Sequence, residues 1–401
     1  MFEWVVVLNW VYFVEELYEY LTEVLVSEDG TEQRIALRHL PRQEVVFTPL
    51  AAGVQQRVYQ RLLAMWQHRA FLMADWARKS PLQSLSPDRR TLHLRDPLPG
   101  LEAGGLLTLR VDGSPDRPVW SRTLEIEDVA LDAQSVTVVS AVDLDMPAGA
   151  VAHIAGEYHA AGALGSQRIT SNVAVPTMQF RRTWTGGARP EPPAPEATWR
   201  GHELILRRPN WAQRVNLAHQ HPFDWVDTGR GRFGFRTPVD AATDVRSATV
   251  LCGTREDVDY WVGWFHRMRG QRGRFFAPTW TQDVGLPPGE PLLEGGLQLP
   301  VDDPGEVNRP DSDPVYRHLY IRLFDGTVLL REVMSGGLGE AGPVLNLDLP
   351  WPRDIERSEI VAIHYMPKWR SANDRLTVLW RTDGVAEITL SWQVLRSDDD
   401  D

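Results

Sequence analysis

The stretch TREDVDYWVGWFHRMRGQRGRFFAPTW, residues 254–280, contains a complete helix-and-strand packing unit. Thr254 is a favourable N-cap, and Asp257, three residues later, supplies the acid of a short capping box. Gly270 predicts the end of the helix. Apolar residues recur at the i, i+3, i+4, i+7 spacing of one helical face, at Val258, Trp261, Val262 and Phe265.

An aromatic strand is expected to follow this helix. Residues 271–274 predict a turn around Gly273. The strand that this turn introduces carries Phe275, Phe276 and Trp280. Such a strand can lie over the helix, so the stretch predicts a helix packed on a sheet, and none of its residues indicates catalysis.

The chain contains the same plan a second time, in TPLAAGVQQRVYQRLLAMWQHRAFLMADW, residues 48–76. Thr48 is the expected cap and Pro49 the favoured first helical residue. Trp66 is expected to close the helix, and residues 71–76 to form the aromatic strand. The apolar face of this helix consists of Val54, Val58, Leu62 and Met65.

Further anchors occur in the same order in both halves, which indicates an internal duplication. The matched pairs are Asn9-Trp10 with Asn210-Trp211, Val26 with Val226, Val45–Phe47 with Ala248–Leu251, Trp76 with Trp280, 104–113 with 317–326, 146–154 with 355–363, Arg168–Thr170 with Arg375–Thr377, and Val173–Phe180 with Val385–Trp392. Segments 104–113 and 317–326 both end in Asp-Gly, a strong hairpin signal.

We therefore predict a mainly β protein (α+β) with one packed helix per half, built as two tandem β-barrels or sandwiches. Its organisation is a first domain at 1–185, a proline-rich linker at 186–198, a second domain at 199–397 and an acidic tail at 398–401. Each domain is expected to carry a small β insertion, at about 85–165 and about 285–365.

The composition excludes several classes of protein. The chain has 401 residues, 43% hydrophobic and 24% charged, which is long enough for two globular domains. Its single cysteine, Cys252, excludes internal disulfides, zinc ribbons and four-thiolate iron–sulfur sites. The apolar segment Trp4–Val14 is too short to span a bilayer and lacks the basic region of a signal peptide, so we predict an aromatic strand there.

The candidate chemical motifs are weak. Residues 229–234 spell GxGxxG, but no helix is expected to follow, so a hairpin tip is the better interpretation. His219 and His221 could face one way as a metal pair, but they lack a third ligand. His153 and His364 occupy matching positions in the two halves, which favours a structural use.

Paired acids together with abundant tryptophans would suit a glycoside hydrolase. The candidate acids lie in no distinctive motif: Asp257, Asp259, Asp302, Asp303 and Asp348. No serine-hydrolase, Walker or zinc-protease motif is present in the sequence. We therefore expect no enzymatic activity, no cofactor and no metal.

Arginines recur in both halves of a chain whose net charge is −12, so they favour a protein interface over a nucleic-acid groove. The N-terminal aromatic segment is a second candidate for reaching a neighbouring subunit. The interface residues predicted in this way are Trp4, Trp10, Arg34, Arg38, Arg42, Arg267, Arg269, Arg272 and Arg274.

Four segments together resemble the tail-tip proteins of long, non-contractile-tailed bacteriophages. They are GTEQRIALRHLPR at 30–42, RRPNW at 207–211, RMRGQRGRFFAPTW at 267–280 and WRSANDRLTVLWRTDGVAEITLSWQVL at 369–395. The resemblance covers most of the chain. It implies a tail-tube-like β fold and a structural ring in the virion, between the tail tube and the hub, close to the tape measure protein.

That resemblance also implies partners. Three chains with two barrels each would make a six-barrel ring, with six chains per ring as the other possibility, and an acidic wall would let DNA slide through without specific binding. A ring would pair the sheet edges that otherwise cause aggregation. The alternatives are a baseplate hub protein and a carbohydrate-binding protein for host attachment, and no membrane contact is expected.

Overall fold

The computed structural model describes residues 2–4, 10–27, 30–112, 119–130, 132–162, 165–183, 192–210, 215–221, 224–227, 229–231, 233–236, 242–340 and 342–396. Within these residues the chain is mainly β with packed helices, so the predicted fold class is confirmed. The predicted tail at 398–401 and residues 186–191 of the predicted linker lie outside the described residues.

The first half of the chain holds one long helix, α1 (Val54–Trp66). Its strands are β1 (Phe2–Glu3), β2 (Val14–Glu19), β3 (Thr22–Val26), β4 (Glu32–Ala36), β5 (Arg42–Phe47), β6 (Ala51–Ala52), β7 (Phe71–Leu85), β8 (Thr91–Leu94), β9 (Leu106–Val111), β10 (Trp120–Val129), β11 (Ser135–Val138), β12 (Val151–Ala160), β13 (Gly165–Thr170) and β14 (Val173–Thr183).

The second half holds helices α2 (Arg255–Met268) and α3 (Gly305–Ser312) and the 3-10 turns η1 (Gly270–Arg272), η2 (Pro314–Arg317) and η3 (Arg357–Glu359). Its strands are β15 (Thr198–Trp199), β16 (His202–Leu204), β17 (Asn216–Gln220), β18 (Asp224–Asp227), β19 (Phe233–Arg236), β20 (Thr243–Cys252), β21 (Phe275–Phe276), β22 (Gln298–Pro300), β23 (His318–Leu323), β24 (Val328–Gly339), β25 (Gly342–Leu347), β26 (Ile360–Tyr365), β27 (Lys368–Ser371), β28 (Arg375–Trp380) and β29 (Ala386–Val394).

The strands of the two halves pair in the same order. In the first half the order is β2–β5–β14–β12–β7–β1, with β13 also on β14. In the second half it is β17–β20–β29–β27–β21–β16, with β28 also on β29. The β1–β7 and β16–β21 pairs are both parallel, whereas the other pairs in these two orders are antiparallel.

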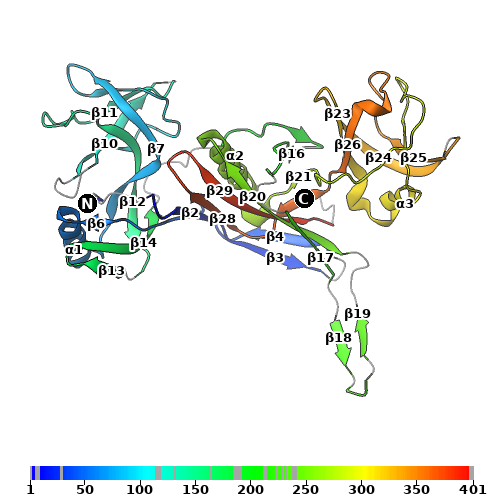
Figure 1. Cartoon of the computed structure of the whole chain (residues 1–401), viewed down its shortest axis with the longest axis horizontal. Helices are drawn as coiled ribbons and strands as arrows, with labels where there is room; N and C mark the ends of the chain where they lie inside the picture. The colour runs from blue at the N-terminus through cyan, green and yellow to red at the C-terminus, as the bar shows by residue number, and fades with distance from the viewer. Residues whose placement is uncertain are drawn as a thin grey trace.

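Each half also carries a separate β unit between the strands that follow its long helix. In the first half, strands β8–β11–β10–β9 complete a closed ring of pairings with β7 and β12. In the second half the order β22–β25–β24–β23–β26 forms a five-stranded sheet. These units have their own apolar cores and lie at the upper left and upper right of Figure 1. The first one ends within β12, because β13 belongs to the main sheet.

Pairing corrects some of the anchors matched by sequence: Val26, opposite Glu32, corresponds to Asp227, opposite Phe233, and not to Val226. The largest correction concerns Arg168–Thr170. Gly165 faces Thr177 across β13–β14, and Thr377 faces Thr389 across β28–β29. With β14 and β29 aligned through their partner strands, Gly165 corresponds to Thr377, so Arg168 corresponds to Trp380 and not to Arg375. Strand position is set by hydrogen-bond register, and the similar letters were a coincidence.

The two long helices differ at their beginnings. Helix α2 begins at the predicted Thr254 cap, with the capping box to Asp257 complete. It ends at Met268, and both Arg269 and the predicted helix stop Gly270 take a positive φ after it, of 53° and 69°. The Thr48 cap predicted for α1 is wrong: residues 51–52 pair with β14 as β6, and the helix starts after Gly53, whose φ is 55°.

Two further expectations are corrected. Trp280 was predicted in the aromatic strand, but β21 ends at Phe276 and Trp280 is a buried residue with a positive φ of 59°. One helix per half was predicted, but the second half adds α3. Residues 95–105, between β8 and β9 in the first half, contain no such helix.

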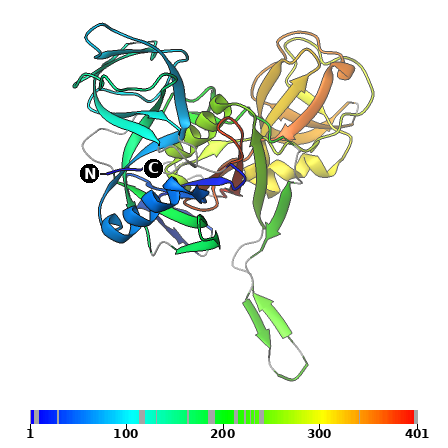
Figure 2. The same ribbon diagram turned by 60° about the vertical axis from the view of Figure 1, so that its left-hand side comes forward.

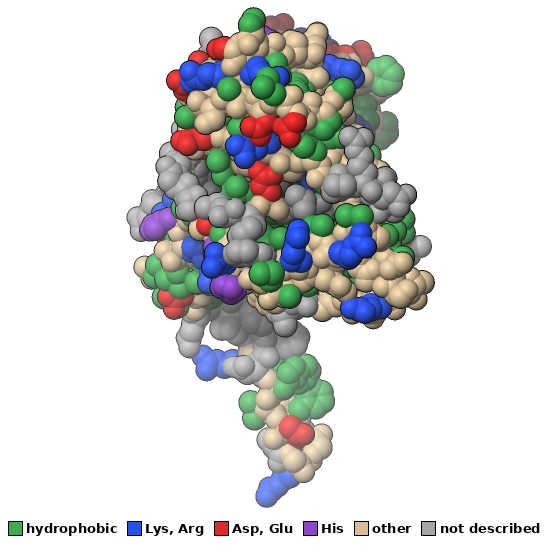
Figure 3. Space-filling model, turned by 90° about the vertical axis from the view of Figure 1, so that its left-hand side faces the viewer, with side chains coloured by type: hydrophobic (Ala, Val, Ile, Leu, Met, Phe, Trp, Pro, Cys, Tyr) green, Lys and Arg blue, Asp and Glu red, His purple; other side chains and the backbone are tan. Residues whose placement is uncertain are grey.

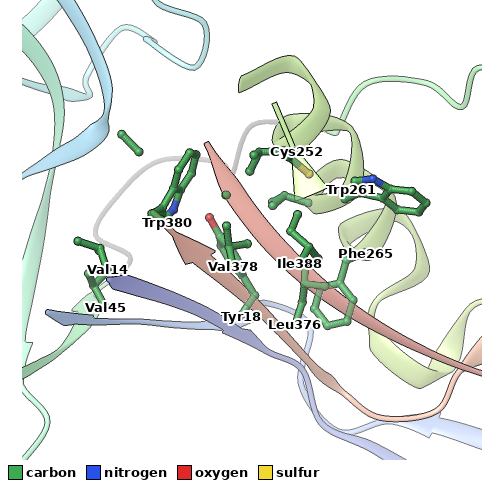
Figure 4. Close-up of a cluster of buried hydrophobic side chains, with 14 of the residues drawn as sticks. Val14, Tyr18, Val45, Cys252, Trp261, Phe265, Leu376, Val378, Trp380 and Ile388 are labelled. Carbon is green, nitrogen blue, oxygen red and sulfur yellow. The ribbon is translucent and has the colours of Figure 1, made fainter. Parts of the chain in front are cut away.

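The main core joins both halves of the chain. Strand β2 pairs along its whole length with β28, which carries the first-half sheet into the second-half sheet. Figure 4 shows the side chains that pack there, from β2 and β5 on one side and from β28, β29 and α2 on the other. Cys252 lies in this core, and burial raises the pKa of its thiol to about 12, so it is a core residue and not a nucleophile.

Candidate assembly site

The junction between the halves is a strand-to-strand contact that is specified by its register. Residues Val14 to Glu19 face Trp380 to Arg375 in antiparallel order. Strand β28 buries alternate side chains, whereas β2 buries Glu16, Leu17 and Tyr18 in succession. Trp380 and Tyr18 close one face of the junction. A slip of one residue would turn these side chains to the opposite face of the sheet, so the register is strongly determined.

A hairpin reinforces the junction. Strands β3 and β4 lie within residues 20–41, which we name the inner hairpin, and they contact the turn η1 of the other half. The Asp374 carboxylate accepts hydrogen bonds from the Thr22 backbone N–H at 2.5 Å, from the Thr22 hydroxyl at 2.9 Å and from the Gln271 N–H at 2.8 Å. Arg370 donates to both oxygens of Glu32, at 2.7 and 2.9 Å, in a buried ion pair.

The base of the inner hairpin fills a pocket beside the end of α2. Tyr20 is buried, its ring lies 5.6 Å from that of Phe265, and its hydroxyl is 3.2 Å from His266 Nδ1. These contacts join residues about 250 positions apart. The sequence contained no local signal for them.

Several of the predicted interface arginines make contacts within the chain. Arg34 donates to the Gly273 carbonyl at the junction between the halves, and Arg38 donates to Glu19. Arg267 holds the buried Glu203 carboxylate with two hydrogen bonds of 2.8 and 2.6 Å.

The other predicted interface residues are placed as follows. Arg42 lies 3.8 Å from Glu19, Arg269 caps α2, Arg272 ends η1 and Arg274 precedes β21. Trp4 is 1% exposed and packs edge-on against Phe47, Phe71 and Phe180, while Trp10 packs against the main core. The N-terminal strand β1 pairs with β7 of its own half.

Strands β17 and β13 lie at the two ends of the joined sheet. They occupy the same positions in their halves as β2 and β28, the two strands that pair at the junction. Among the described strands, β17 pairs only with β20 and β13 pairs only with β14. Every residue of both strands is exposed, whereas their counterparts at the junction are largely buried. The molecule therefore presents one edge of each kind that its own junction uses.

A second hairpin projects from the body beside β17. We name residues 221–242 the outer hairpin; its strands β18 and β19 pair with Trp225 facing Phe235 and Asp227 facing Phe233. Figures 1 and 2 show it extending away from the rest of the chain. Gly229 and Gly231 lie between the two strands at positive φ, and Phe233 and Gly234 begin β19, so the hairpin interpretation of GxGxxG is confirmed.

Titratable groups at the junction have structural roles. Glu16 is buried and accepts hydrogen bonds from Tyr18, Gln43 and Trp380, and burial raises the pKa of its carboxyl. The nearby Asp259 lies 3.5 Å from Arg78, and burial raises its pKa as well. Of these groups, Glu16 lines a small, mainly apolar space of about 20 Å³ together with Asp75 and Trp380.

The other candidate residues also make local structural contacts. Asp257 completes the cap of α2, Asp348 accepts from the Glu332 N–H, and Asp302 and Asp303 lie in the loop before α3. His219, on the exposed strand β17, is 2.5 Å from Asp244. His153 and His364 each bond a backbone carbonyl, and burial lowers the pKa of both imidazoles, that of His153 to about 4.

Within the described residues, no group of three or more His, Cys, Asp and Glu side chains is arranged to hold a metal ion. Across the same residues, none of the helices combines the length and apolar composition needed to span a bilayer.

Comparison with known proteins gave no relative: no protein-family model matches the chain, and no curated protein matches it. What can be inferred about function therefore rests on the strand edges, the two hairpins and the residues that lie around them.

Proposed function

We propose that the chain is a structural ring subunit of a phage tail tip, which assembles by repeating between molecules the contact that joins its own halves. The observation that carries the proposal is the pair of exposed edges, β13 and β17, which correspond to β28 and β2 of the internal junction. An edge strand is a template for pairing with another chain, and a head-to-tail contact closes into a ring when the rotation allows it.

The shared strand order supports an ancestral duplication, and the duplication supports the stoichiometry. If each half is one unit of a six-unit ring, three chains complete it; six chains per ring would contradict this part of the proposal. Such a ring would join a sixfold tail tube to a threefold hub in the virion, near the tape measure protein. The net charge of −12 on each chain suits a channel wall past which DNA moves without specific binding, and the proposal assigns the ring no catalytic step.

The register of the β2–β28 pair inside the chain predicts the register in which β17 of one copy should pair with β13 of the next. The outermost pair of β2–β5 is Glu19 with Arg42, and that of β17–β20 is Gln220 with Thr243, so first-half numbers plus 201 give second-half numbers in this region. Glu16 then corresponds to Leu217, and Val378 corresponds to Ser166 through β14 and β29. Since Glu16 faces Val378, Leu217 of one copy should face Ser166 of the next.

A disulfide tests this register. Facing residues on antiparallel strands have Cα atoms about 4.5–5.5 Å apart, within the range that a disulfide bridges. The variant Leu217→Cys with Ser166→Cys should oxidise to covalent dimers and then trimers on a non-reducing gel, with closed trimers as the largest product. Exclusively monomeric protein, in solution and on the gel, would overturn the proposed function.

The matched control shifts one cysteine by one position. Ala218→Cys with Ser166→Cys places the two thiols on opposite faces of the sheet, so it should cross-link at least tenfold more slowly. Equal rates would mean random collision and would contradict the register.

Within the two β units, tryptophan burial favours a structural role over glycan binding. Trp351 is buried in the core of the second β unit, and Trp120 packs against the core of the first. A glycan-binding surface would need several aromatic faces open to solvent together. On these units only Phe324, alone at a hairpin turn, is a strongly exposed aromatic among the described residues. The hub alternative shares the ring geometry, and the position of the protein in imaged tails would distinguish the two.

A further inference from the structure

We infer that the outer hairpin docks into a hollow at the end of α1 in a second copy of this chain. This inference rests on the proposed function, because it assigns the hairpin to the next subunit of the same ring. The inner hairpin already makes the corresponding contact inside the molecule.

The two hairpins occupy the same place in their halves. The inner hairpin leaves the sheet after Glu19 and returns at Arg42, so 42 − 19 − 1 leaves 22 residues. The outer hairpin leaves after Gln220 and returns at Thr243, and 243 − 220 − 1 also leaves 22 residues. The inner hairpin lies on the other half of its own chain, whereas the outer hairpin projects from the body (Figure 2).

The receptor of the inner hairpin also has a counterpart. The inner hairpin lies against the end of α2, the turn η1 and the residues before β28. The first-half counterparts are the end of α1 and the residues between β12 and β13. A hollow of about 460 Å³ lies there, lined by Leu63, Ala64, Gln67, His68, Ala160 and Gly162.

The hollow lacks the side chain that fills its counterpart. The receptor in the second half contains Phe265, against which Tyr20 of the inner hairpin packs. By the shift of 201, the residue that corresponds to Phe265 in the first half is Ala64. Ala64 and the nearby Gly162 are small, so the first-half site is left open. The hollow there is large enough to take an aromatic side chain. α1 and β13 lie at the left end of the molecule in Figure 1, and the outer hairpin lies beyond the centre on the other side. One copy therefore offers the hairpin where the next can offer the hollow.

The surface of the outer hairpin suits an apolar contact. Trp225, Phe233 and Phe235 are 61, 67 and 67% exposed, and the ring of Trp225 lies 5.3 Å from that of Phe233. Figure 3 shows apolar side chains gathered on the projecting segment. A two-stranded hairpin is marginally stable in water on its own, and clustered exposed aromatic residues mark an interaction site.

The two hairpins differ in chemistry, so each suits its own receptor better than the receptor of the other. Glu32 of the inner hairpin pairs with the buried Arg370, whereas the outer hairpin has Phe233 at the corresponding position. The residue corresponding to Arg370 is His159, which is exposed on β12. At this position the first-half receptor therefore offers an exposed imidazole in place of a buried guanidinium, and an aromatic hairpin suits it better than a charged one.

A photo-crosslink locates the contact. The full chain with benzoylphenylalanine at Phe235 is irradiated at assembly concentration, and the linked peptides are identified by mass spectrometry. Links to residues 60–70 or 158–162 of a second copy are expected. Links only between outer hairpins, links only to other surfaces, or no links in assembled rings would overturn this inference.

The same experiment separates the two proposals. If the Leu217→Cys with Ser166→Cys variant still closes into disulfide-linked trimers while the photo-links miss the hollow, the ring stands and the hairpin assignment fails. If no assembly forms, both fail.

A triple variant measures the contribution of the contact. Trp225→Ser with Phe233→Ser and Phe235→Ser should weaken assembly by about 100-fold or more, read as the concentration at half-assembly in mass photometry, because three large apolar side chains lose their burial. The matched control is Phe324→Ser, which removes an aromatic side chain that is 85% exposed on the second β unit and should leave assembly within twofold of the parent. A triple variant that assembles like this control would contradict the inference.

Discussion

Replacing Asp374 by alanine should release the inner hairpin from the second half of the chain. The Asp374 carboxylate accepts three hydrogen bonds, two of them from the backbone N–H groups of Thr22 and Gln271. A hydrogen bond to a charged group contributes about 1.5–3 kcal/mol when buried, and less where water can replace the partner. Asp374 is half-buried, so about 1 kcal/mol per bond is appropriate, and the expected loss is about 3 kcal/mol.

The assay is equilibrium unfolding in urea, followed by tryptophan fluorescence, with hydrogen exchange over residues 22–36 as a local reading. A loss of about 3 kcal/mol corresponds to an opening equilibrium raised by roughly 100-fold, so these amides should exchange about 100-fold faster. The control is Asp383→Ala, which removes an exposed ion pair with Lys79 and should cost under about 1 kcal/mol. Equal effects of the two variants would refute the assignment of Asp374 as the clamp of the hairpin.

Two further predictions concern burial. The pKa of His153 is lowered from 6.5 to about 4 in the folded chain, so between these values the unfolded chain binds more protons. Stability should therefore fall by up to about 3 kcal/mol as the pH drops from 7 to 4, and His153→Gln should remove that part of the pH dependence in urea titrations; an unchanged pH profile would contradict it. Trp4→Ala should cost about 3–5 kcal/mol in the same assay, because it empties a site packed by three phenylalanines, whereas Trp225→Ala should leave monomer stability within about 0.5 kcal/mol; equal costs would refute the burial argument.

Local features were predictable because they depend on residues near one another in sequence. The cap of α2 needs only Thr254 and Asp257, and its buried face needs only helical spacing. Hairpins at Gly229–Gly231 and at Asp325-Gly326 follow from turn chemistry. The mainly β class with one long helix in each half follows from such local signals.

The beginning of α1 was not predictable from the same signals. Thr48 and Pro49 form a favourable helix start, but Ala51 and Ala52 pair with β14 from about 120 residues away. That tertiary pairing overrides the local preference. The shift of the last anchor from Arg375 to Trp380 has the same origin, because the register of β13 is set by its partner strand.

The sequence by itself predicted the mainly β class, the cap and buried face of α2, and one long helix in each half. Only the tertiary structure decided which strand edges pair when the two halves join and which edges stay exposed. The reason is the distance along the sequence: Glu16 and Val378 face each other but are 362 positions apart. Nothing in the sequence around either residue indicates the other. An interface made from such pairings is visible only once the sheet is assembled, and so are the edges and the hollow that remain for a second copy.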